Sequence, residues 1–222
     1  MEGATGVVHP DQLVPDGRNY TQAQSLLTRD VNAVITGILT VEPAAYICVG
    51  DGHATMRNIL LEDLHPNAEL VCGPATIQNK PLCQLEGISS KFDIAMCIGY
   101  HTKAGTPGGL LAHTFVGSLI SDLRMNGVSV GEVEVNSAVM SSYGVPLCLI
   151  YGNSDLEAEI RAWNDASVFL ASKTVLGPTA AICKPPAITQ RLLEHGAARA
   201  TADSQTWFRY ACGSVRFEVD TK

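Results

Sequence analysis

The sequence predicts an α/β domain with a three-layer sandwich architecture, in which helices cover both faces of a mostly parallel central sheet. Short apolar runs alternate with amphipathic segments along the chain, which is typical of this class. The 222 residues are 46% hydrophobic and 17% charged, which is enough apolar material for one sizeable core. Three of the apolar runs end in a glycine followed by polar residues, at Gly50, Gly99 and Gly152. In such folds the ligand site lies beyond the carboxyl ends of the strands.

The first half of the chain is expected to contain one long helix and three short strands. Residues 1–19 are rich in glycine, proline and aspartate and are expected to form a loop. A helix follows, because apolar side chains recur at spacings of three and four residues. Its buried face comprises Ala23, Leu26, Leu27, Val31, Val34, Ile35 and Ile38. The expected strands lie at residues 46–49, 69–72 and 92–98. A short helical turn within residues 56–64 is expected to end before Pro66.

The second half begins with a predicted hairpin. Asn126-Gly127 is a strong two-residue turn signal between strands expected at 119–125 and 128–130. Helices are expected at residues 132–143, 154–163 and 186–200. Strands are expected at residues 146–150, 168–175 and 208–219, the last with a break at Gly213. Ser154 is the expected N-cap of its helix, because a hydroxyl oxygen can accept a hydrogen bond from the first helical N–H groups.

Charge and hydropathy argue against several classes of protein. The 15 basic and 22 acidic residues give a formal net charge of −7, so nucleic-acid binding by phosphate neutralisation is not expected. No apolar run approaches the ~20 residues that a membrane span needs, and the amino-terminal residues are not expected to form a signal peptide. The cysteines form no C-x-x-C pair, which predicts reduced thiols in a cytoplasmic protein. They are Cys48, Cys72, Cys83, Cys97, Cys148, Cys183 and Cys212.

Two histidines follow the ends of predicted strands. His53 lies in the segment Gly50-Asp51-Gly52-His53, and His101 lies in Gly99-Tyr100-His101. If these two strands are parallel members of one sheet, both imidazoles emerge at the same edge. Imidazoles together with carboxylates are the ligands of hydrolytic zinc sites. The sequence therefore indicates a candidate metal site at this edge.

The acidic candidates are Glu2, Asp51 and Glu132. Glu132 is expected in the first turn of its helix, where the helix dipole favours an anion with or without a metal. Asp51 either caps the turn that holds His53 or orients its imidazole. His113 follows a glycine-rich loop and could act as a general acid or base. Each of these residues also has a purely structural interpretation, in which it only forms hydrogen bonds within its own loop or helix.

Short motifs are spread over most of the chain in a definite order. They include Met1-Glu2-Gly3, Arg18-Asn19-Tyr20, Asp51-Gly52-His53, Leu64-His65-Pro66, Gly99-Tyr100-His101, His113-Thr114 and Val130-Gly131-Glu132. In this order and spacing they resemble the D-aminopeptidase family, peptidase family M55, whose members are dinuclear zinc peptidases. The resemblance implies hydrolysis of short peptides that begin with a D-amino acid. It also implies assembly into a ring-shaped homo-oligomer, such as a decamer, that encloses the active sites.

The resemblance also implies a set of site residues. Two zinc ions are expected per subunit, the first held by Glu2 and His101 and the second by His53 and Glu132. His113 matches the family's proposed catalytic residue. In such a site the two ions polarise the peptide carbonyl and generate hydroxide near neutral pH, and His113 would shuttle a proton or stabilise the oxyanion. Glu86 is a candidate for anchoring the substrate amine.

The chain departs from the family pattern at its beginning. Family members carry an aspartate that bridges both ions, one position before the Met-Glu-Gly triplet, on a strand of its own. The resemblance therefore predicts one domain over residues 1–222 that lacks this first strand and a C-terminal αβ segment. Gly50 and Gln84 also depart from the family's asparagine and methionine, but neither change removes a ligand.

Three functional interpretations follow. The leading one is a cytoplasmic zinc aminopeptidase that acts on short peptides and binds neither nucleic acid nor membrane. The missing aspartate favours a metal-poor relative that only binds peptides or assembles with full-length subunits. A third interpretation keeps the two-metal centre but changes the substrate to lactams or other small amides. The metal content of the purified chain separates the first two.

Overall fold

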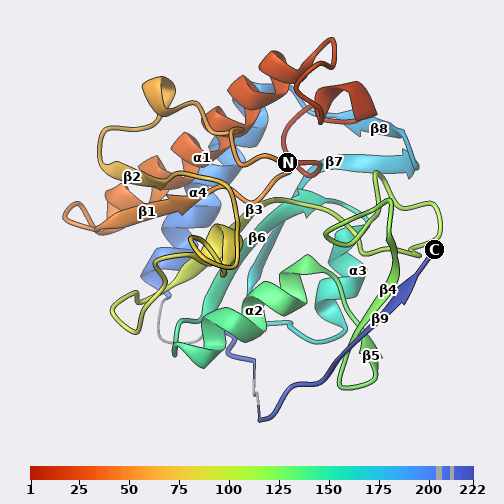
Figure 1. Ribbon diagram of the computed structural model, residues 1–222. Coiled ribbons are helices and arrows are strands. Elements are labelled where there is room, and N and C mark those ends of the chain that lie inside the picture. The colour runs from red at the N-terminus through yellow and green to blue at the C-terminus, as the bar shows by residue number, and fades with distance from the viewer. Residues whose placement is uncertain (204–206, 211–212) are drawn as a thin grey trace.

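A four-stranded sheet forms the centre of the computed structural model, which describes residues 1–203, 207–210 and 213–222 (Figure 1). Strands β3 (Ala95–Tyr100), β6 (Leu147–Asn153) and β7 (Val168–Gly177) are parallel, and β8 (Ala180–Cys183) pairs antiparallel with β7 at one edge. The predicted α/β class with a mostly parallel sheet is confirmed. Strand β8 was not predicted, because its four apolar residues form a run too short to assign from its pattern, and most of them are exposed.

Helices cover both faces of this sheet (Figure 1). Helices α1 (Tyr20–Val41) and α4 (Pro186–Ala202) pack against each other on one face, and α2 (Glu132–Ser142) and α3 (Leu156–Arg161) cover the other. Strand β6 is buried along its whole length. Its Leu149 and Tyr151 belong to the core under α1 and α4, and Ile150 belongs to the core under α2 and α3. No helix in the described part of the chain is long and apolar enough to cross a bilayer.

Two smaller sheets flank the centre. Strands β1 (Ile47–Gly50) and β2 (Ala68–Val71) form a parallel pair. Strand β4 (Ile120–Met125) pairs antiparallel with β5 (Val128–Ser129) and with β9 (Phe217–Thr221). The sequence left open whether the strands that precede His53 and His101 are members of one sheet. The described residues place them in separate sheets, because the backbone of β1 pairs with β2 and that of β3 with β6.

Several predicted boundaries shift in the structure. Helix α3 begins at Leu156 with Asp155 at its N-cap, because the hydroxyl of Ser154 instead accepts the N–H of Val175 at 2.9 Å. The strand expected at 208–219 is reduced to β9, and Phe208 forms only a single bridge to Leu147. Part of that expected strand, residues 211–212 with Cys212, lies outside the described residues. The 3-10 turns are η1 (Pro10–Gln12), η2 (Leu61–Asp63) and η3 (Cys83–Leu85).

Candidate metal centre

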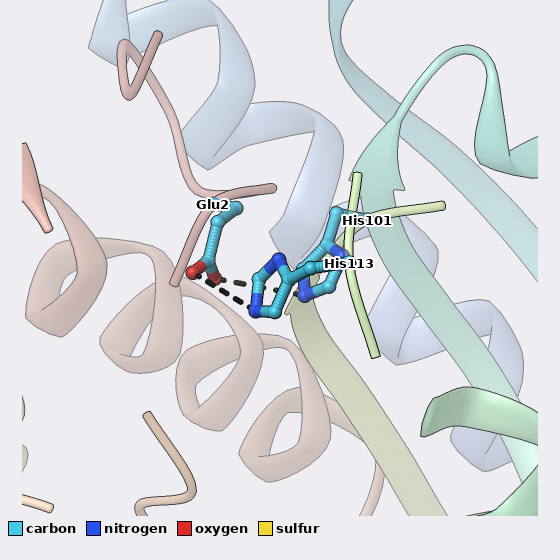
Figure 2. Close-up of side chains that lie close together, drawn as sticks. All are labelled: Glu2, His101 and His113. Atoms are coloured by element: carbon cyan, nitrogen blue, oxygen red, sulfur yellow. Dashed lines mark ion pairs between the residues drawn. The ribbon is translucent and has the colours of Figure 1, made fainter. Parts of the chain in front are cut away.

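Glu2 is carried by an amino-terminal loop that crosses the end of β3. The N–H of Gly3 donates to the carbonyl of Gly99 at 3.0 Å, which fixes the loop against the strand. A Cβ atom at Gly3 would lie 1.8 Å from the carbonyl oxygen of Tyr100, so only glycine allows this close approach. The Glu2 side chain is 3% exposed and points away from the loop into the site (Figure 2).

The carboxylate of Glu2 is held in its ionised form. Burial alone would raise its pKa, because a charge is poorly solvated inside a protein. The amino group of Met1, 2.9 Å from Glu2 Oε2, and the imidazoles of His101 and His53 in their protonated form outweigh burial and hold the pKa of Glu2 well below its ordinary value. Glu2 therefore presents a buried negative charge to its neighbours.

Three imidazoles converge on this carboxylate. His53 Nδ1 lies 3.1 Å from Glu2 Oε1, and His113 Nε2 lies 3.7 Å from the same oxygen. His101 Nε2 lies 3.8 Å from Glu2 Oε2. Figure 2 shows His101 and His113 side by side, both directed toward Glu2; their rings stack with centroids 4.1 Å apart and planes 12° apart. The ligand atoms of Glu2, His101 and His113 all lie within 4.8 Å of one another.

Glu132 adds a second carboxylate. It is the first residue of α2, as the sequence predicts, and its Oε1 lies 3.7 Å from His101 Nε2 and 3.9 Å from His113 Nε2. The same oxygen accepts the N–H of Phe115 at 2.9 Å, which directs it toward the imidazoles. Among the described residues no ion pair joins Glu132 to His53, so the division of ligands between two ions stays a prediction.

One ring nitrogen of each imidazole lies within hydrogen-bonding distance of a backbone carbonyl oxygen. The pairs are His53 Nε2 with Leu13 at 2.9 Å, His101 Nδ1 with Thr102 at 2.9 Å, and His113 Nδ1 with Leu111 at 2.8 Å. A carbonyl only accepts, so these nitrogens carry the proton. In a neutral imidazole the other nitrogen then has a free lone pair, and that nitrogen is the one that faces the carboxylates. A backbone partner of this kind is how metal-binding histidines are oriented.

The donor set fits zinc. Lone pairs of neutral imidazoles and carboxylate oxygens that face each other at 3.1 to 3.9 Å repel unless a proton or a metal ion lies between them. Burial and the stacked His101 both lower the pKa of His113, which favours its neutral ring. Zinc bonds of about 2.0–2.2 Å in tetrahedral geometry put neighbouring ligand atoms about 3.3 Å apart, close to the observed separations.

Asp51 organises the loop that carries His53. Its carboxylate accepts the N–H of His53 at 3.1 Å, the N–H of Ile59 at 3.2 Å, and both the N–H and the side-chain amide of Asn58. Asn58 also donates to the carbonyl of His53 at 2.6 Å. These contacts support the capping interpretation of Asp51 over a ligand role. The chemistry of Asn58 alone does not reveal this role in the sequence, because the role depends on contacts that only the folded loop creates.

The site opens into a cavity of about 1380 Å³. All the predicted site residues line it, namely Glu2, His53, His101, His113 and Glu132. Glu86 lines the cavity as well, and its Oε2 accepts the N–H of Leu82 at 3.1 Å. Phe115 and Val116 line it with about half of their surface exposed. The cavity therefore offers both polar and apolar walls to a ligand at the centre.

An α/β sandwich with imidazoles and carboxylates gathered at the ends of its strands has the architecture of a metal-dependent hydrolase. Comparison with known proteins makes this specific. The chain belongs to the D-aminopeptidase family, peptidase family M55, whose sequence profile matches residues 1–222. The family resemblance that the motifs indicated is thus confirmed.

Two relatives illustrate the similarity. A D-aminopeptidase of Bacillus subtilis (strain 168) is 30% identical over 195 residues, which cover 87% of this chain and 68% of that protein. The solved structure of the Zn-dependent D-aminopeptidase DppA from Bacillus subtilis, described as a self-compartmentalizing protease, matches with a TM-score of 0.87 and 28% identity. That match covers 93% of this chain and 73% of the other.

Proposed function

We propose that this chain is a zinc-dependent aminopeptidase that hydrolyses short peptides with an N-terminal D-amino acid. The observation that carries the proposal is the set of three imidazoles, each tied to a backbone carbonyl by one nitrogen, whose other nitrogens face Glu2 and Glu132. Membership of the D-aminopeptidase family and the zinc dependence of a structural relative support the choice of metal and substrate.

Glu2, His53, His101 and Glu132 are the residues that we expect to hold two zinc ions. Bound zinc supplies a Lewis acid for the scissile carbonyl and a hydroxide nucleophile near neutral pH. The protein's own contribution is to hold two carboxylates and two imidazoles in fixed orientations. The backbone partners of the imidazoles and the N–H of Phe115 on Glu132 provide that orientation.

His113 is the residue that we propose for proton transfer. Its Nδ1–H donates to the carbonyl of Leu111, so Nε2 is the basic nitrogen and faces the two carboxylates. Burial and His101 lower its pKa, which keeps the ring neutral and able to accept a proton near pH 7. Leu111 and Phe115, two residues to either side, both adopt positive φ angles, of 54° and 51°. The hydrogen bond between Nδ1 and the carbonyl of Leu111 fixes the direction of the His113 ring.

Access to the site is expected to limit the substrates to short peptides. The structural relative is described as a self-compartmentalizing protease. We propose that this chain likewise assembles into a ring-shaped homo-oligomer with its sites enclosed, which would exclude folded proteins. The mass of the purified particle in solution tests this part of the proposal, and a monomer would contradict it.

The function is tested by hydrolysis of D-alanyl and L-alanyl dipeptides before and after removal of metal with a chelator. We expect cleavage of the D-alanyl substrate to disappear with the metal and to return on addition of zinc. We expect the L-alanyl substrate to be slower by more than about tenfold in kcat/KM. Hydrolysis that survives the chelator, a preference for the L-substrate, or turnover of lactams alone would contradict the proposal. Absence of both zinc and turnover would favour a silent relative.

A further inference from the structure

Lys173 of β7 is a fully buried lysine that donates hydrogen bonds to the amino-terminal loop that carries Glu2. Its side chain is 0% exposed. Its Nζ donates to the carbonyls of Glu2 at 3.1 Å and Ala4 at 2.7 Å, and to the hydroxyl of Ser172 at 3.1 Å. An ammonium group has three N–H donors, so each donor of Lys173 has an acceptor. Two of these acceptors belong to the loop that carries the Glu2 carboxylate.

The charge of Lys173 is stabilised by the carbonyls of this loop and by the negative charge of nearby acidic groups such as Asp30. Among the described residues no ion pair involves Lys173, so the carbonyl dipoles of Glu2 and Ala4 replace the water that the ammonium group lost on burial. An apolar side chain at this place would avoid that desolvation cost altogether. The hydrogen bonds of Lys173 to the loop are therefore better explained by the position that they give the loop than by a contribution to the stability of the core.

A second buried charged side chain holds the same loop. Asp30 of α1 is 0% exposed and accepts the N–H of Thr5 at 2.8 Å and its hydroxyl at 2.7 Å. The hydroxyl of Tyr151 lies 2.7 Å from the Thr5 hydroxyl. Residues 2–5 are thus held between a cation on β7 and an anion on α1, while Gly3 lies tightly against Tyr100. The loop has little freedom to adjust if one of these contacts is lost.

We propose that Lys173 is a positioning residue for the metal centre, which fixes the direction of the Glu2 carboxylate by holding the carbonyls of Glu2 and Ala4. The inference rests on the proposed function. The carboxylate of Glu2 has to reach His53, His101 and His113 at 3.1 to 3.8 Å at the same time. A small shift of the loop changes all three of these distances together. Loss of the lysine therefore weakens metal binding without removing a ligand.

The test is the zinc affinity of the metal-free 222-residue chain, measured by competition with a chromogenic chelator. Lys173→Met keeps the bulk of the side chain and removes its donors. We expect it to weaken zinc binding by about 10- to 100-fold, the range found for groups that support metal ligands. Lys173→Gln keeps an N–H donor on a shorter side chain. Its zinc affinity is expected to lie between those of Lys173→Met and wild type.

Two controls separate positioning from general destabilisation. Leu193→Ala opens the fully buried core between α4 and β6, and Lys184→Met removes an exposed lysine whose Nζ donates to the carbonyl of Ala171. Both should bind zinc like wild type, although Leu193→Ala lowers the melting temperature. Equal losses of affinity in Lys173→Met and Leu193→Ala would overturn the positioning role.

The remaining outcomes keep the two proposals distinguishable. If wild type binds zinc and Lys173→Met binds it equally well, the positioning role fails while the proposed function stands. If wild type binds no zinc, the proposed function itself fails. If Lys173→Met does not fold, Lys173→Gln carries the test, and wild-type affinity in that variant would overturn the inference.

Discussion

Asp51→Asn is expected to loosen the loop that presents His53 to the metal centre. Asp51 Oδ2 accepts the N–H groups of Asn58 and Ile59, the latter at 3.2 Å, and Oδ1 accepts the N–H of His53 at 3.1 Å. An asparagine replaces one of these oxygens by an NH2 group, which donates and cannot accept. One or two backbone N–H groups therefore lose their acceptor in either orientation of the amide.

The expected loss of stability follows from these contacts. A hydrogen bond to a charged group contributes about 1.5–3 kcal/mol, so losing one or two predicts a decrease of about 2–5 kcal/mol in the free energy of unfolding. Urea unfolding of the metal-free chain, followed by circular dichroism, measures it. Zinc affinity should fall in the same variant, because His53 is no longer held toward Glu2.

The matched control is Asp63→Asn, at an exposed position in η2. It removes the same charge and should stay within about 0.5 kcal/mol of wild type. If Asp51→Asn is as stable as this control and binds zinc normally, the assignment of Asp51 as the organiser of the His53 loop is wrong.

Three further predictions concern the other parts of the site. Burial raises the pKa of Asp30 from 3.8 to about 6, against the opposing effect of Thr5. The folded chain thus keeps a proton that the unfolded chain releases, and stability falls by up to about 3 kcal/mol as the pH rises through this range. Asp30→Asn should flatten that part of the stability profile in urea titrations, and an unchanged slope contradicts the assignment. His113→Ala should lower kcat by about 10²–10⁴ with zinc stoichiometry unchanged; loss of zinc would instead make His113 a ligand. Gly3→Ala places a Cβ 1.8 Å from the carbonyl oxygen of Tyr100, so calorimetric titration should show weakened zinc binding, and normal binding would count against a rigid loop.

Features that depend on neighbouring residues in the chain, such as strand ends and helix starts, were predictable from the sequence. The strand ends before His53 and His101 were recognisable because an apolar run, a glycine and polar residues follow one another there. Glu132 was expected at a helix start and is the first residue of α2. These residues line one cavity, and their roles as metal ligands stay a prediction.

Contacts between segments that are distant in the chain could not be predicted from the sequence. Nothing in residues 46–49 indicates that this strand pairs with β2 and not with β3, because strand partners depend on the rest of the fold. Lys173 is the one charged residue of the strand predicted at 168–175, but it lies between Ser172 and Thr174, so its neighbours give little indication that it is buried. Its acceptors on Glu2 and Ala4 lie 171 and 169 positions away, so its role became visible only in the structure.

The most direct measurement of the metal centre is anomalous X-ray diffraction at the zinc absorption edge, from crystals of the zinc-loaded chain. We expect anomalous peaks inside the cavity at about 2.0–2.2 Å from donor atoms of Glu2, His53, His101 and Glu132. Crystals without a peak near these four residues, or with zinc bound only elsewhere on the chain, would contradict the proposed centre.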